Sequence, residues 1–71
     1  MKWNIFHKKK PRQGELILLK IDGFIYCTTA YLTKINKQFA YKSIYDKENI
    51  LEYAKTNDMW CYLSDVNSEK V

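Results

Sequence analysis

Glycine, proline and histidine are scarce in this 71-residue chain, which contains two, one and one of them respectively. With only Gly14 and Gly23, the chain cannot build the glycine-rich loop that cradles a phosphate group. The single histidine, His7, has no acid or nucleophile near it at catalytic spacing. These shortages exclude the common hydrolytic and phosphoryl-transfer site patterns, and we predict that the protein is not an enzyme and has no catalytic residues.

Cysteine is equally sparse. Cys27 and Cys61 lie far apart, without the Cys-x-x-Cys or Cys–His spacing of a zinc site, and two cysteines are too few for a disulfide scaffold. We therefore predict two reduced and largely buried thiols, and neither a metal ion nor a cofactor.

Long apolar runs are also missing. The run at residues 16–19 has the length of a strand, whereas a membrane helix needs ~20 residues. Residues 1–6 are too short for the apolar region of a secretion signal, and the main lysine cluster follows them instead of preceding them. We expect a cytoplasmic protein without a membrane partner.

The composition nevertheless favours a folded domain. A hydrophobic content of 46% and an aromatic content of 15% are too high for a disordered chain. A chain of this length buries only about 60% of the surface that it exposes when unfolded, so most apolar side chains are needed in one core.

Positive charge is concentrated at the start of the chain, although the net charge is +4 overall. Residues 1–12 carry five basic side chains and no acid, whereas the rest of the chain is close to neutral. Proline and glycine follow the lysines, which is typical of an exposed segment. We predict a basic N-terminal arm at residues 1–14 whose Trp3 docks on the domain, because a tryptophan is costly to leave in water.

Residues 15–63 have the pattern of a single β-rich domain. The apolar run 15–21 predicts a strand buried on both faces, and Asp22-Gly23 predicts a type I′ hairpin turn. Residues 24–34 are β-branched and aromatic, which predicts a long second strand that bends or carries a bulge. Asn36-Lys37 predicts another turn, followed by a strand at 38–42.

The pattern changes after residue 43. Ile50, Leu51, Tyr53 and Ala54 have helical spacing behind Asp46, a suitable N-cap, so we predict a short helix within residues 43–57. A last strand at 58–63 and a flexible tail at 64–71 complete the chain. We expect a β-rich α+β fold, with about four strands in a small antiparallel curved sheet or open barrel and one short helix before the last strand. The inward side chains should include Ile17, Leu19, Ile21, Leu32, Phe39, Met59, Leu63 and at least one tryptophan.

Several short motifs resemble the domain-of-unknown-function 551 family, a group of small phage and prophage domains. They are Trp3, Pro11, the Gly14-Glu15 pair before the first strand, and the closing Trp60-Cys61-Tyr62-Leu63. The chain departs from the family at its basic 10–13 turn, in the missing prolines beside Trp60 and in an additional stretch before the last strand. The family has no assigned activity, so the resemblance implies only a phage or mobile-element accessory protein.

Exposed aromatic side chains suggest a protein-interaction module. A small domain with eleven aromatic residues has difficulty burying all of them, and tyrosine and tryptophan are enriched at interface hot spots. We expect an exposed patch of two or more tyrosines, used to bind a protein partner or a second copy. The candidate partner-binding residues are Tyr26, Tyr31, Tyr41, Trp60 and Tyr62.

Nucleic-acid binding is the alternative. The basic residues Lys8, Lys9, Lys10 and Arg12 are suited to the phosphate backbone. The same sheet aromatics could stack on bases.

Overall fold

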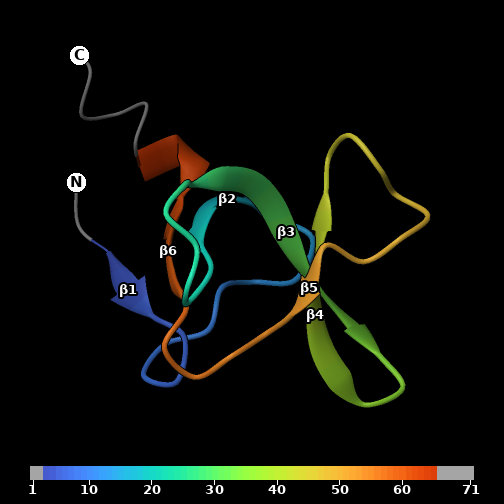
Figure 1. Ribbon diagram of the computed structural model, residues 1–71, viewed down its shortest axis with the longest axis horizontal. Coiled ribbons are helices and arrows are strands. Elements are labelled where there is room, and N and C mark those ends of the chain that lie inside the picture. Colours follow the sequence, from blue (N-terminus) through green and yellow to red (C-terminus); the bar gives the residue numbers. More distant parts are fainter. Residues whose placement is uncertain (1–2, 66–71) are drawn as a thin grey trace.

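The computed structural model describes residues 3–65, which form an antiparallel sheet of six strands (Figure 1). The strand order is β1-β6-β2-β3-β4-β5, so β6 lies between the first two strands, and the sheet is open at β1 and β5. The β-rich antiparallel prediction is confirmed, but the expected number of four strands is wrong, because the two-residue strands at both edges had not been predicted. The strands are β1 (Asn4–Ile5), β2 (Leu16–Lys20), β3 (Thr28–Ile35), β4 (Gln38–Ser43), β5 (Glu52–Tyr53) and β6 (Met59–Tyr62).

The long strand β3 joins the two halves of the sheet. Its first residues pair with β2 and its later residues pair with β4, with Ala30 and Tyr31 paired on both sides. Figure 1 shows β3 as a strongly curved ribbon between these neighbours. The predicted bend is therefore present, and it folds the sheet around its inner face.

The turn between β3 and β4 has the geometry that a type I′ hairpin requires. Asn36 and Lys37 have positive φ angles of 50° and 67°, and Ile35 pairs with Gln38 on either side of them. This two-residue connection matches the right-handed twist of the two strands. The predicted turn and the strand that follows it are confirmed.

The connection between β2 and β3 is longer than predicted. Phe24 N donates to Ile21 O at 2.9 Å, which closes the expected turn at Asp22-Gly23. Gly23 has a φ of +90°, but Asp22 is not among the residues with positive φ, so the turn is not type I′. Residues 24–27 then continue as a loop, because the pairing of β2 with β3 reaches only Leu19 and Thr28. The prediction of a strand from residue 24 is wrong over these four residues.

The helix predicted within residues 43–57 is absent from that segment. Leu51 N donates to Tyr41 O and Ala54 N donates to Phe39 O, so the chain adds β5 to the edge of β4. Helical spacing misled the prediction because the apolar side chains in this segment do not share one buried face: Leu51 and Tyr53 are exposed. The helical residues of the described chain begin after β6, at Leu63.

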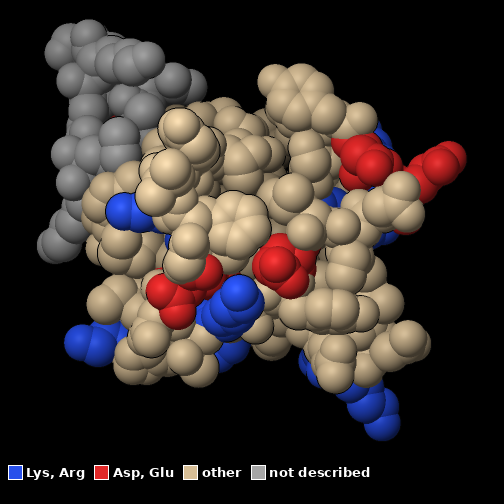
Figure 2. All heavy atoms as spheres, viewed as in Figure 1, with Lys and Arg blue, Asp and Glu red and all other residues tan. Residues whose placement is uncertain are grey.

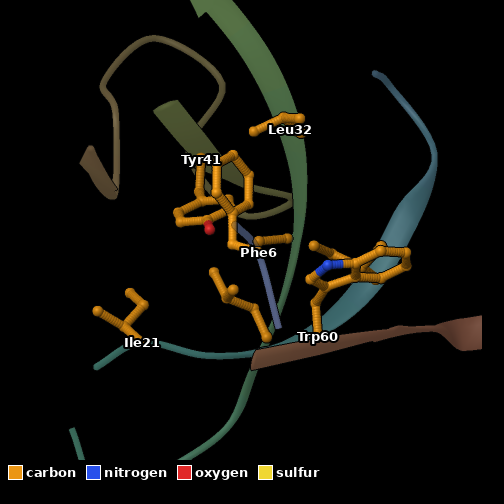
Figure 3. Packing of buried hydrophobic residues seen from close by; sticks show 8 residues of the cluster. Phe6, Ile21, Leu32, Tyr41 and Trp60 are labelled. Atoms are coloured by element: carbon orange, nitrogen blue, oxygen red, sulfur yellow. The ribbon is translucent and has the colours of Figure 1, made fainter. Parts of the chain in front are cut away.

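The core lies on the inner face of the curved sheet (Figure 3). Ile17, Leu19, Ile21, Leu32 and Trp60 are buried in it, as predicted. The predicted core residues Phe39, Met59 and Leu63 are only partly buried. The core also contains three residues that had not been assigned to it: Phe6, Ala30 and Tyr41.

The N-terminal segment is part of this core. Strand β1 pairs with β6, and the Phe6 ring packs edge-on against the rings of Phe39 and Tyr41 at 6.0 and 6.1 Å. Trp60 Nε1 donates to Lys9 O at 2.7 Å, and Pro11 is buried. The segment before the predicted boundary at residue 14 therefore supplies an edge strand and a core side chain to the domain.

The two ends of the described chain differ in their contacts. Trp3 is partly buried, in line with the docking predicted for it, whereas Ser64 and Asp65 are exposed. The remainder of the predicted tail, residues 66–71, lies outside the described residues.

Candidate interaction surface

The loop between β2 and β3 exposes large apolar side chains. Phe24, Ile25 and Tyr26 have 52%, 81% and 79% of their surface exposed, and Cys27 is exposed next to them. We call residues 24–27 the apolar loop. Burying a side chain of this size is worth about 1.5–3 kcal/mol, so three consecutive residues forgo a large stabilisation in a small domain. The arrangement leaves that free energy to be gained when another molecule covers the loop.

A groove of about 390 Å³ runs along the base of the apolar loop. Its apolar lining residues are Phe24, Ile25, the partly buried Met59 and the buried Ile21. The remaining lining residues are Gly23 and the polar Lys20, Asp22 and Asn57. The groove is therefore apolar with a polar margin, which suits an inserted aliphatic or aromatic side chain.

The turn that begins the apolar loop is held by a buried carboxylate. Asp58 is fully buried, and its Oδ1 accepts a hydrogen bond from Asp22 N at 2.8 Å. Its Oδ2 accepts from Tyr41 Oη at 2.8 Å and from Lys55 N at 2.7 Å. Buried carboxylates are costly unless they accept several hydrogen bonds, and these three meet that requirement. Asp58 thus links the start of the apolar loop to β4 and to the turn before β6.

This environment changes the pKa of Tyr41. Burial raises the pKa of the Tyr41 phenol well above its usual value, and the hydrogen bond to Asp58 and the charge of that carboxylate raise it further. The phenol therefore stays protonated and serves as a hydrogen-bond donor in the folded protein.

A basic turn, residues 6–9, lies next to the turn before β6. His7 N donates to Thr56 O at 3.2 Å and Phe6 N donates to Asp58 O at 2.9 Å, which attaches the chain after β1 to the turn before β6. Lys8 and Lys9 follow with exposed side chains, since only their backbone groups bond to the fold. In Figure 2, basic side chains project at the lower left, where Figure 1 places this turn.

The predicted partner-binding residues occupy very different places. Tyr26 is on the apolar loop, whereas Tyr31 and Tyr62 are partly buried. Tyr41 and Trp60 are fully buried, so neither of these predicted contact residues is accessible to a partner at the surface of this structure. Trp60 pairs with Leu19 on the core-facing side of β6, and Tyr41 points inward from β4 to Asp58. Two further tyrosines, Tyr45 and Tyr53, are also exposed.

The basic residues predicted to bind a nucleic acid differ in their contacts with the rest of the protein. Arg12 forms a bidentate ion pair with Glu15 at 3.0 and 2.7 Å, which raises the pKa of its guanidinium, and it lies over the Tyr62 ring at 4.3 Å. Lys10 Nζ lies 5.5 Å from the centre of the Phe6 ring. Lys8 and Lys9 are the more accessible pair.

Sequence reasoning missed the apolar loop and the role of Asp58. Phe24, Ile25 and Tyr26 are strong β-formers, so their composition favoured a strand. The Asp22-Gly23 turn was the available signal that the chain leaves β2. Nothing in the sequence distinguishes Asp58 from a surface acid. The predicted burial of both cysteines holds for Cys61 and is wrong for Cys27, which the loop exposes.

No protein-family model, curated protein or solved structure matches the chain. The resemblance to the domain-of-unknown-function 551 family therefore stays a prediction. Within residues 3–65, no helix is long and apolar enough to span a membrane. The same residues contain no group of three or more histidine, cysteine or acidic side chains that could hold a metal ion.

Proposed function

We propose that this protein is a non-catalytic protein-interaction module that binds a partner through the apolar loop. One observation carries the proposal: Phe24, Ile25 and Tyr26 are strongly exposed on a loop whose first turn is fixed to the core through Asp58. An anchored loop loses little conformational entropy on binding, so more of the free energy of burial becomes affinity.

The chemistry of the loop supports a protein partner. Aromatic and aliphatic side chains without charges are characteristic of the buried centre of an interface, and residues 24–27 contain no charged side chain. The groove beside them can receive a side chain from the partner.

The biological setting is proposed from the family resemblance alone. It is that of a phage or mobile-element accessory protein, which acts in a bacterial cytoplasm on a host protein or on a second copy of itself.

An affinity capture from bacterial lysate tests the proposal. The wild-type protein should retain a defined set of proteins after nuclease treatment, and the triple variant F24S/I25S/Y26S should lose them. Leu16→Ser is the control, because Leu16 is also exposed but lies on β2, outside the loop. Equal retention by the wild type and the triple variant would refute binding through the apolar loop.

Nucleic-acid binding remains the second candidate because Lys8, Lys9 and Lys10 are exposed. The burial of Tyr41 and Trp60 removes two of the rings that would have stacked on bases. Capture that nuclease abolishes, and that K8Q/K9Q/K10Q also abolishes, would favour this candidate.

A further inference from the structure

We infer that the partner segment is acidic and apolar: it inserts an aliphatic or aromatic side chain into the groove and places aspartate or glutamate residues beside it. This inference rests on the proposed function and names the class of partner that the same surface would bind. It follows from the charges around the groove.

Lysine residues occur in the groove and on segments next to it. Lys20, at the end of β2, is one of its lining residues. Lys55 is exposed on the turn that also carries Asn57, another lining residue. Lys8 and Lys9 lie on the basic turn, which the bond from His7 N to Thr56 O holds against the same turn. One lysine therefore lines the groove, and three more belong to segments that adjoin its lining residues.

Acidic groups do not balance these lysines. Asp22 is the acid among the lining residues, and the carboxylate of Asp58 is buried and satisfied by three hydrogen bonds. Glu15 is paired with Arg12. Further acids lie on other elements: Asp46 and Glu48 on the loop between β4 and β5, Glu52 on β5, and Asp65 after β6. A partner with negative side chains would supply the missing complement.

An acidic protein segment fits these features better than a nucleic acid. A phosphate backbone would use the lysines but leave the apolar surface of Ile25 and Met59 without a matching group. A peptide can place carboxylates and an apolar side chain within a few residues of each other. Asn57 adds an amide that can bond to a peptide backbone.

Selection from random peptides displayed on phage tests the inference without assuming a sequence. The wild-type protein should enrich peptides that combine aspartate or glutamate with leucine, phenylalanine or tryptophan. The variant K8E/K9E should weaken the binding of those peptides by about fivefold or more, and added salt should weaken wild-type binding. These two lysines bond to the fold through backbone groups, so the variant should fold normally.

A matched control separates local charge from net charge. The variant K34E/K37E changes the net charge by the same amount, but Lys34 lies near the end of β3 and Lys37 in the turn that follows, away from the groove (Figure 1). Its peptide affinities should stay within about twofold of the wild-type values. A labelled oligothymidylate, measured in parallel, should bind more weakly than the enriched peptides.

The outcomes separate this inference from the proposed function. Enrichment of neutral or basic peptides that still requires Phe24, Ile25 and Tyr26 would overturn the acidic partner and leave the apolar loop as the binding surface. Acidic peptides that bind F24S/I25S/Y26S as well as the wild type would refute the proposed function. Tighter binding of the oligothymidylate, or no enrichment of any peptide, would overturn the inference.

Discussion

Tyr41 Oη donates a hydrogen bond of 2.8 Å to Asp58 Oδ2, and both residues are fully buried. The bond joins β4 to the turn before β6 inside the core. The other carboxylate oxygen holds the turn at Asp22, from which the apolar loop departs. A polar contact inside the core therefore connects the stability of the fold to the placement of its candidate binding surface.

Replacing Asp58 with alanine should destabilise the protein strongly. The buried Tyr41 Oη and the partly buried Asp22 N and Lys55 N would lose their acceptor, and a buried donor left unsatisfied costs about 1–3 kcal/mol. We expect the free energy of unfolding to fall by about 3 kcal/mol or more, measured by urea denaturation. Asp65→Ala, at an exposed position, is the control and should change it by less than about 0.5 kcal/mol. Similar values for both variants would contradict the role given to Asp58.

Tyr41→Phe should alter how stability depends on pH. The pKa of Tyr41 is raised in the folded protein, so its stabilising contribution is complete below the unfolded pKa of about 10 and declines as the pH rises above that value. Above pH ~10 the wild type should lose about 1.4 kcal/mol per pH unit from this group, and the phenylalanine variant should lack that loss. Near pH 7 the variant should be less stable by about 1.5–3 kcal/mol, because a hydrogen bond to a charged acceptor is missing. Parallel curves of unfolding free energy against pH would argue against a buried, protonated Tyr41.

Phe6→Ala tests whether the N-terminal segment belongs to the core. Truncating this buried ring should cost about 3–5 kcal/mol, because it removes the packing on Phe39 and Tyr41 and leaves a cavity. The neighbouring substitution His7→Ala, at an exposed side chain, should cost less than about 0.5 kcal/mol. Thermal unfolding of the two variants gives the comparison. If Phe6→Ala were as stable as the wild type, residues 1–14 would be the detachable arm that the sequence suggested.

The apolar loop should matter for binding and hardly at all for folding. Serine at Phe24, Ile25 or Tyr26 removes side chains that are more than half exposed, so each change should shift the unfolding free energy by less than about 1 kcal/mol. Losses near 2 kcal/mol per site, measured by denaturant unfolding, would mean that the loop packs on the domain instead of standing free.

The sequence predicted those parts of the fold that depend on local signals. Asn36-Lys37 marked a turn, and the apolar run at β2 indicated that Ile17 and Leu19 are core residues, because local backbone preference and burial agree there. It failed where a distant contact decides the outcome. The segment after residue 43 has helical spacing, yet Glu52 and Tyr53 pair with the backbone of β4 and form β5.

The candidate site was harder to predict than the fold. The partner-binding residues were predicted from residue type, as tyrosines and a tryptophan. Tyr41 and Trp60 are buried in the core, and only the structure distinguishes them from the exposed Tyr26. The importance of Asp58 depends on three donors, of which Asp22 and Tyr41 are distant in sequence, so no short motif could reveal it.

The reactivity of Cys27 offers the most direct test of the apolar loop as the binding surface. This thiol is exposed on the loop, whereas Cys61 is buried, so a maleimide should label the folded protein quickly at Cys27 and slowly at Cys61. The decisive measurement is the rate of Cys27 labelling in the free protein and in the complex recovered from nuclease-treated lysate. We predict that the partner slows labelling of Cys27 at least several-fold. An unchanged rate while the partner remains bound would contradict the account.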